Sequence, residues 1–326
     1  MPDSEQRVLV PARRLAVAPQ QVGLALALVV TIALFAVTTP YFFAIDNGFN
    51  ILRVASYTGV AAAIATLVLV SGGIDLSVAA VMALSGTVSA GLIEAGWPVW
   101  AAILAALGTA FVAGLINAFI VTTIGINPLI ATIATQFIFR GFAYIVISQR
   151  EILISDRHFL YFGQGDLLGV PTPAVLMLLC FIGIGFAMKM TAFGQQVYAI
   201  GGSPDGQMAK LAGVPLKRRQ YQIYIASAVV SGFAGLLLAS YSGTGDGNSA
   251  LGLELPIIAA AILGGTALGG GRGSVVGTLL GVLLLGVITN GMTLHNVTYV
   301  WGLVVQGVAL LLAVVIDERR QRKERT

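Results

Sequence analysis

The stretch VAAAIATLVLVSGGIDLS, residues 60–77, combines in one place features that recur along the chain. An uncharged apolar run is followed by a glycine pair, Gly72 and Gly73, and then by a carboxylate, Asp75. Together with residues 51–59 the run is long enough to cross a bilayer, since a membrane-spanning helix needs about 20 mostly apolar residues. The stretch therefore predicts a transmembrane helix that stops at a glycine break with an acid beside it.

The composition extends this interpretation to the whole chain. Of the 326 residues, 57% are hydrophobic and only 10% are charged, and the mean hydropathy is +0.91. Soluble domains average about 25% charged residues, so an ordinary water-soluble fold is excluded. The predicted fold class is an all-α polytopic membrane protein of about ten transmembrane helices, which would use about 200 residues and leave short loops.

Ten apolar segments lie between breaks rich in glycine, proline or charge. Two of them, 78–93 and 256–268, are short for a straight crossing and adjoin glycine-rich sequence, which favours broken or partly inserted helices there. The predicted spans are 22–39, 51–70, 78–93, 99–124, 128–147, 173–188, 222–240, 256–268, 274–291 and 298–316.

Lysine and arginine are distributed unevenly over the resulting loops. With both termini inside, fourteen of the 18 Lys and Arg lie inside and three outside, while Arg140 falls within a span. Positive residues are enriched in cytoplasmic loops, so the bias predicts cytoplasmic termini and an even number of spans. The predicted organisation is a polar cytosolic tail (1–20), a transmembrane domain (21–317) embedded in membrane lipid, and a basic cytosolic tail (318–326).

Two loops are longer than simple connectors, residues 148–172 outside and 189–221 inside. Loops of more than about 12–15 residues are usually functional or disordered. We therefore expect docking surfaces on opposite sides of the membrane. The charged residues of the outer loop are Arg150, Glu151, Asp156 and Arg157.

The inner loop carries the signals of a short helix over 203–213. Ser203 can cap free backbone N–H groups, Pro204 fits the first helical position, and Asp205 sits favourably near the positive end of the helix dipole. Gly213 is well placed as the C-terminal stop. At about 15 Å this helix is too short to cross a bilayer, so it should lie along the membrane surface.

One face of this predicted helix is apolar. Met208, Leu211 and Ala212 recur at i, i+3 and i+4, and Lys210 falls off that face. The apolar face either packs on the protein's own bundle or is available to a partner.

Polar residues at membrane depth are costly and are functional candidates. Asp75 can cap the helix that follows it or take part in gating. Asn117, Gln136 and Asn290 can form hydrogen bonds between helices, and Arg140 can snorkel or pair within the bundle. The scarcity of intramembrane acids argues against a proton or sodium relay, and therefore against an ion-driven transporter.

Glycine spacing predicts close helix packing. Gly273, Gly277 and Gly281 recur every four residues and leave one helix face bare for another helix to approach. Residues 72–77 are weakly echoed by residues 264–269, and each stretch ends a span on the inner side, which suggests duplicated structural units.

Several chemistries are excluded or disfavoured by the sequence. His158, His295 and Cys180 stand alone, without a metal-ligand spacing. Residues 264–274 are glycine-rich but lack the phosphate-loop pattern and follow an apolar helix rather than a strand, so no ATP site or cofactor site is predicted on this chain. No basic stripe with stacking aromatics indicates nucleic-acid binding.

Several motifs together resemble those of one family. They are Ser71-Gly-Gly-Ile-Asp-Leu-Ser77, Phe193-Gly-Gln-Gln-Val-Tyr-Ala-Ile-Gly-Gly202 and its continuation Met208-Ala-Lys-Leu-Ala-Gly-Val214, residues 253–266 (LELPIIAAAILGGT), residues 270–278 (GGRGSVVGT) and Asn290-Gly291. The chain resembles the ribose/xylose/galactose-type permeases of bacterial ABC sugar importers over about residues 24–317. It departs from the family pattern at Ala267, where Ser is usual, and at Ser203, where Asn is usual.

The resemblance implies a permease subunit in the bacterial inner membrane rather than an enzyme. Its fold would be like that of the ten-helix permeases of the vitamin-B12-importer type. Two permease chains, identical or paralogous, would pair, with a periplasmic sugar-binding protein outside and ATP-binding cassette subunits holding ATP and Mg²⁺ inside.

The resemblance also suggests roles for residues singled out above. The 203–213 helix would be the coupling helix seated in the ATPase, and the binding protein would contact Arg150, Glu151, Asp156 and Arg157. A sparse polar path for the sugar is expected near Asp75, Asn117, Gln136 and Asn290. The alternatives are an ion-coupled secondary transporter of a small polar solute and, less favoured, a membrane-embedded enzyme.

Overall fold

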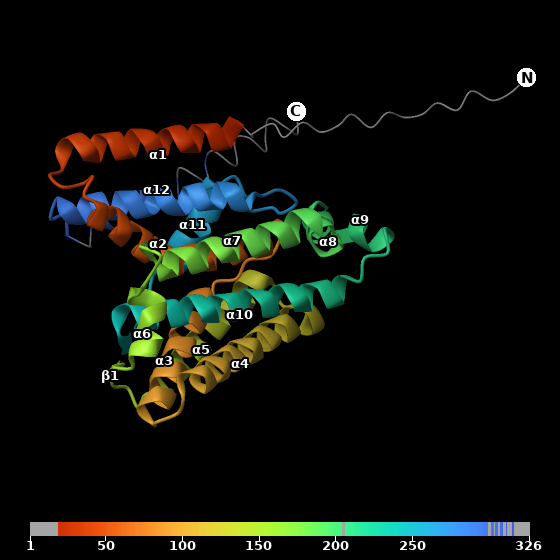
Figure 1. Ribbon diagram of the computed structural model, residues 1–326. Coiled ribbons are helices and arrows are strands. Elements are labelled where there is room, and N and C mark those ends of the chain that lie inside the picture. Colours follow the sequence, from red (N-terminus) through yellow and green to blue (C-terminus); the bar gives the residue numbers. More distant parts are fainter. Residues whose placement is uncertain are drawn as a thin grey trace, which may run out of the picture.

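The computed structural model (Figure 1) describes residues 19–203 and 206–298, with isolated positions between 301 and 315. All structural statements below concern these residues. Nearly all of the two predicted tails, and most of the predicted span 298–316, lie outside the described part of the chain.

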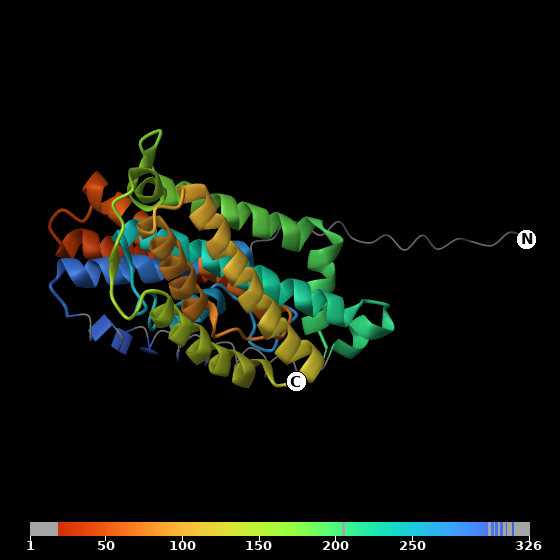
Figure 2. The ribbon, with the colours of Figure 1, turned by 90° about the horizontal axis from the view of Figure 1, so that it is seen from below.

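The described chain is a bundle of long helices joined by short elements (Figures 1 and 2). Four very short strands form two antiparallel pairs, β1 with β4 and β2 with β3. The long helices are α1 (Pro19–Thr38), α2 (Ile45–Val70), α3 (Val78–Glu94), α4 (Val99–Ala118), α5 (Pro128–Val146), α7 (Thr172–Met190), α10 (Leu216–Ser242) and α12 (Val275–Leu294). The short elements are the π-helix η1 (Phe119–Ile124), α6 (Arg157–Gln164), α8 (Ala192–Gly201), α9 (Gln207–Leu211), α11 (Glu254–Leu263), β1 (Ile152–Leu153), β2 (Asp166–Leu167), β3 (Val170–Pro171) and β4 (Thr244–Gly245).

Every predicted span before residue 298 corresponds to a helix, with shifted ends. Seven helices of the described chain are long and apolar enough to cross a bilayer, and α3 and α11 are shorter apolar helices. The predicted span 256–268 is wrong in extent, because α11 begins at Glu254 and ends at Leu263. It ends there because the next residues turn away through Gly265, whose φ is +96°.

The bundle has two distinct ends. One, the sheet end, holds α6 and both strand pairs together with residues 94–99 and 147–156. The other, the cavity end, is formed by residues 71–77, 119–128, 200–215 and 264–274. Helices α8 and α9 project at the cavity end in both ribbon views (Figures 1 and 2).

The core is built from small and aliphatic side chains around α2, α3 and α10. Residues 59–70 of α2 are all buried, and α10 packs against α2, α3 and α4. Gly114 and Gly235 allow these backbones to approach, since a Cβ on Gly235 would lie 2.1 Å from the Met82 carbonyl oxygen. Apolar side chains also face outward, as Phe137 does at 73% exposure, which suits a bundle surrounded by lipid.

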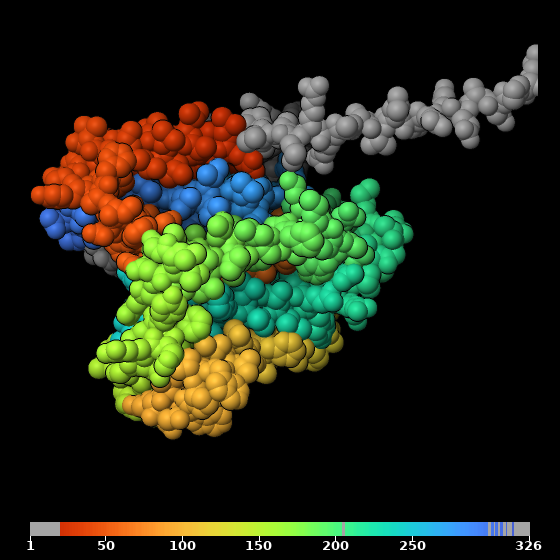
Figure 3. Space-filling view, in the orientation of Figure 1, coloured from red at the N-terminus to blue at the C-terminus, as the bar shows by residue number. Residues whose placement is uncertain are grey.

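Helix α1 lies on one flank of the molecule. Figure 3 shows it covering α12, with α3 and α4 on the opposite flank. The Gln21 amide donates to Ser274 Oγ at 2.7 Å, and the Thr39 hydroxyl lies 2.8 Å from His295 Nε2. The two helices are therefore tied at both ends.

Helices α2 and α11 end in the same way. The N–H groups of Gly72 and Gly73 donate to the carbonyls of Leu69 and Val68 at 2.9 and 3.1 Å. At the end of α11, Gly265 and Thr266 repeat this pattern with Ile262 and Ala261 at 2.9 and 3.0 Å. Both ends are Schellman motifs. The two stretches therefore share a helix-ending motif, in which Gly72 corresponds to Gly265 rather than to Gly264.

The bare glycine face is confirmed on α12. A Cβ on Gly277 would lie 1.9 Å from the Gly264 carbonyl oxygen, and a Cβ on Gly281 would lie 2.2 Å from that of Ala260. Helix α12 thus packs directly on the backbone of α11. Gly273 lies before the helix and would meet Val70 instead.

We predict that Gly281→Ala destabilises the protein by about 1–3 kcal/mol, the usual cost of forcing a methyl group into a filled contact. Gly286→Ala is the matched control on the same helix, because its Cβ would lie 3.5 Å from the nearest atom, the Ala55 Cβ. Thermal unfolding of the purified chain in detergent measures both. Equal melting temperatures for the two variants would contradict the packing described here.

Candidate coupling surface and membrane path

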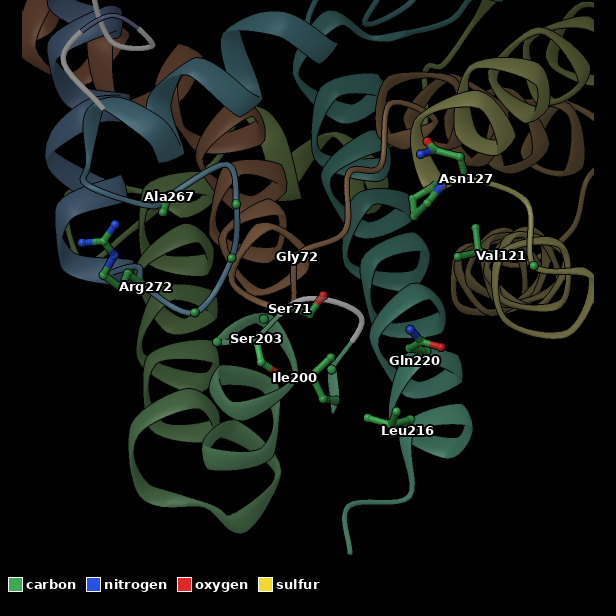
Figure 4. Close-up of a pocket in the computed structure, with 18 of the residues that line it drawn as sticks. Ser71, Gly72, Val121, Asn127, Ile200, Ser203, Leu216, Gln220, Ala267 and Arg272 are labelled. Carbon is green, nitrogen blue, oxygen red and sulfur yellow. The ribbon is translucent and has the colours of Figure 1, made fainter. Parts of the chain in front are cut away.

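A cavity of about 1130 Å³ lies at the cavity end (Figure 4). Asn127 and Gln220 line one side, Ala267 and Arg272 the other, and Ser71 lies between them. The lining therefore comes from segments far apart in the sequence: the end of α2, the start of α5, the start of α10 and the loop between α11 and α12.

Three glycine segments meet in backbone contact beside this cavity. The Gly271 N–H donates to the Val70 carbonyl at 2.8 Å. A Cβ on Gly270 would lie 2.8 Å from the Gly72 Cα and 2.9 Å from the Gly201 Cα. We call this contact of Gly72, Gly201 and Gly270 the glycine junction. It joins the end of α2, the end of α8 and the α11–α12 loop.

The segment α8–α9, which we call the arm, is also held by α10. Arg219 on α10 donates to the Gln196 side chain on α8, and its guanidinium lies 5.6 Å from the ring centroid of Phe193. The arm therefore contacts the rest of the bundle at two places, the glycine junction and α10, and a movement of the arm would displace both.

Only part of the predicted 203–213 helix falls on described residues. There, helix α9 covers Gln207–Leu211 and follows Gly206, whose backbone is left-handed (φ +63°). Pro204 and Asp205 lie outside the described residues. Ser203 still acts near the start, since its hydroxyl accepts from the Met208 N–H at 3.1 Å.

The end of α9 is as predicted, and its apolar residues are exposed. Gly213 (φ +78°) and Val214 donate to the carbonyls of Lys210 and Ala209, each at 3.0 Å, which is a Schellman end. Ala209 is the only buried residue of α9. Met208 is 71% exposed and Leu211 is 89% exposed, and we call these two residues the apolar knob. Lys210 is exposed as well.

Two of the predicted path residues, Asp75 and Asn117, belong to one buried network. Asp75 Oδ1 accepts from the Ser77 N–H at 3.0 Å and the Ser77 hydroxyl at 2.6 Å, and Oδ2 accepts from Ser227 at 2.7 Å. Asn117 donates to Ser77 Oγ at 2.8 Å. Asp75 thus holds Ser77, the N-cap residue of α3, and ties the start of α3 to α4 and α10.

The other two predicted path residues lie elsewhere. The Gln136 amide on α5 donates to Glu254 Oε1 on α11 at 3.2 Å. Asn290 exchanges two hydrogen bonds with Asn47, at 2.8 and 3.1 Å, near the sheet end. The structure therefore does not bring the four residues together. Glu254 was missed from the sequence, although an acid opening an apolar run is a visible signal.

Of the predicted docking residues, two make hydrogen bonds within the chain, Arg150 and Asp156, and two are described only by their exposure, Glu151 and Arg157. Arg150 is exposed and paired with Glu94, with the shorter contact at 2.5 Å, and this hydrogen bond raises the pKa of Arg150. Asp156 caps α6 by accepting from the N–H groups of His158 and Phe159. Glu151 and Arg157 are exposed at the same end.

No group of three or more His, Cys, Asp or Glu side chains able to hold a metal ion is found in the part of the chain that the structure describes. Cys180, the single cysteine, is half-buried on α7.

The helical bundle, with seven described helices long and apolar enough to cross a bilayer, defines a polytopic membrane protein with an exposed arm at one end. The chain belongs to the family described as branched-chain amino acid transport system / permease component, whose model matches residues 47–314. It is a transport subunit rather than an enzyme.

Relatives of known name cover nearly the whole chain. The ribose import permease protein RbsC of Bacillus subtilis (strain 168) is 38% identical over 303 residues, covering 92% of this chain and 94% of the relative. The L-arabinose ABC transporter permease protein AraH of Azospirillum brasilense is 35% identical, covering 93% and 89%. The L-arabinose transport system permease protein AraH of Escherichia coli (strain K12) is 36% identical, covering 94% and 93%. No solved structure matches the chain.

We predict that Asp75→Ala destabilises the chain by about 1–3 kcal/mol, because buried donors at the start of α3 and on α10 lose their acceptor. Asp46→Ala is the control, since Asp46 is an exposed acid in the first turn of α2 and surface changes usually stay within about 0.5 kcal/mol. Unfolding in detergent by heat or by sodium dodecyl sulfate measures both. If Asp46→Ala destabilised the chain as much as Asp75→Ala, the stabilising role assigned to the Asp75 hydrogen bonds would be wrong.

Proposed function

We propose that this chain is the transmembrane permease subunit of an ATP-binding cassette importer, which carries a monosaccharide from a periplasmic binding protein into the cytoplasm. The observation that carries the proposal is the identity of 35–38% to permeases named for ribose and arabinose over more than nine-tenths of the chain. The exposed arm at one end of the bundle supports it, because a subunit driven by another protein needs a surface to be driven through.

The apolar knob would dock into the ATPase subunit, which holds ATP and Mg²⁺. In the chain alone Met208 and Leu211 are left exposed, and their burial in a cleft of the partner would stabilise the complex by the hydrophobic effect. Motion of the ATPase would reach the bundle through the arm and the glycine junction, which connects the arm to α2 and to the α11–α12 loop.

The binding protein would dock at the sheet end. Glu151 and Arg157 are exposed there and available for charged contacts, while Arg150 would have to exchange its bond to Glu94. Charged rim contacts of this kind set the rate and specificity of association more than its affinity. A second permease chain, identical or paralogous, would complete the path.

The distribution of positive charge supports an orientation with the cavity end in the cytoplasm of a bacterial inner membrane. The described Lys and Arg at that end outnumber those at the sheet end, which fits the positive-inside rule. Ten crossings, cytoplasmic termini and a fold of the vitamin-B12-importer type are the finer form of this proposal. The positive residues are Lys189, Lys210, Lys217, Arg218, Arg219 and Arg272 at the cavity end, and Arg53, Arg150 and Arg157 at the sheet end.

Uptake by liposomes tests the function. With ATPase and binding protein present, we expect ATP-dependent accumulation of a sugar such as D-ribose or L-arabinose, and with this chain alone we expect none. An ion-coupled secondary transporter is the alternative, and it would accumulate solute from this chain alone under a proton or sodium gradient. That result would overturn the proposal.

The apolar knob gives a sharper prediction. Met208→Ser combined with Leu211→Asp should reduce ATP-driven uptake by about tenfold or more, because a serine and a charge replace the apolar contact with the ATPase. Membrane insertion should be unchanged, since both side chains are exposed.

Met190→Ser is the matched control, because Met190 lies on α7 near the same end and is also 71% exposed. Co-purification of the ATPase with each variant measures docking directly. Normal co-purification and uptake for the double variant would show that α9 is not the coupling element.

A further inference from the structure

Helix α5 presents a polar stripe to the segment that leads into α11. Gln136, Arg140 and Tyr144 recur every four residues and so lie on one helix face. Arg140 Nη1 donates to the carbonyls of Gly247 and Ser249 at 2.8 and 2.6 Å. These bonds hold an irregular stretch of backbone, residues 246–253, against α5.

The other two residues of the stripe make further hydrogen bonds to the same segment, and we call the whole set of bonds between α5 and residues 246–254 the tether. The Tyr144 hydroxyl donates to Asn248 Oδ1 at 2.5 Å, and Gln136 donates to Glu254 Oε1 at 3.2 Å. The tether runs from the sheet end toward the middle of the bundle.

Gln136 and Arg140 lie near the middle of α5. At 1.5 Å per residue, Gln136 and Arg140 are about 12 and 18 Å along α5 from Pro128 at the cavity end. Glu254 opens α11, whose ten residues place it about 15 Å from the same end. In a hydrocarbon core about 30 Å thick, a carboxylate, a guanidinium and an amide therefore gather near the midplane, beside a helix that crosses only half of it.

The tether leaves two polar atoms unused. Arg140 Nη2 and Glu254 Oε2 are both buried and have no hydrogen-bond partner among the described residues. The two groups are of opposite charge, yet no ion pair joins them in the described chain. A donor and an acceptor of opposite charge therefore stay separate at a depth where unpaired polar groups are costly.

We infer that Arg140 and Glu254, with Gln136, form a contact site for the hydroxyl groups of a neutral polyhydroxylated substrate halfway across the membrane. A hydroxyl both donates and accepts, so one hydroxyl, or two neighbouring ones, can accept from Nη2 and donate to Oε2. The inference rests on the proposed function and names the permease residues that the sugar would touch.

Charge balance favours a neutral ligand over an ion. The guanidinium and the carboxylate together carry no net charge, so a lone cation or anion would meet one attractive and one repulsive partner. In this conformation both atoms are buried, and the site opens when α5 and residues 246–254 move apart. Occupancy is therefore brief, as transport requires release as well as entry.

The test uses the complete importer in liposomes, with the wild-type chain or with Glu254→Gln. The readout is the number of D-ribose or L-arabinose molecules imported per ATP hydrolysed. We expect this ratio to fall by about tenfold, the effect of losing one hydrogen bond to a charged group, with the rate of ATP hydrolysis and the melting temperature unchanged. Asp46→Asn is the matched control, as another acid in the first turn of an apolar helix, and should leave the ratio unchanged.

The outcomes separate the inference from the proposed function. Failure of the wild-type importer to move either sugar, with uptake of the zwitterion L-leucine instead, would overturn both. Sugar uptake by the wild type together with an unchanged ratio in Glu254→Gln would overturn the inference alone, as would a loss of uptake that follows a lower melting temperature. Should Glu254→Gln fail to fold, Glu254→Asp takes its place. This variant keeps the charge but withdraws it from α5, and we expect the same fall in sugar molecules imported per ATP.

Discussion

The close approach of three backbones at the glycine junction is the constraint on which the arrangement of the bundle depends. Gly72 and Gly270 both have positive φ, and Gly201 leaves no room for a Cβ, which would lie 1.9 Å from the Val70 carbonyl oxygen. Side chains at these positions would separate the end of α2, the arm and the α11–α12 loop. No flexible side chain lies between the three backbones, so they pack directly against one another.

Much of the fold could be predicted, because hydrophobic length and glycine breaks are local properties of the sequence. The positions of the spans before residue 298, the stop at Gly213 and the bare face at Gly277 and Gly281 needed no knowledge of distant partners. The described start of α9 at Gln207 could not be predicted, since Ser203-Pro204-Asp205 has good capping chemistry and nothing in the sequence marks Gly206 as left-handed. Pro204 and Asp205 themselves lie outside the described residues.

The candidate site was less accessible to sequence reasoning, because it depends on which helices pack together. Asp75 and Asn117 could be chosen as polar residues at depth, but their meeting through Ser77 follows from the packing of α3 and α4. Asn290 carries the same amide side chain as Asn117, yet it lies near the sheet end of the bundle, where it pairs with Asn47. Arg140 and Glu254 are separated by more than a hundred residues, and they lie on neighbouring segments only because α11 begins at half depth, at Glu254.

The position of α1 against α12 has a consequence for how the protein is made. Its ties join residues about 250 positions apart, from Gln21 to Ser274 and from Thr39 to His295. At 5–20 residues per second, roughly 13 to 50 s of translation separate the two partners. Helix α1 is therefore made well before the segment that it packs against, and its exposed apolar side chains, such as Leu26, Val30 and Val37, suit it to lie in lipid during that interval.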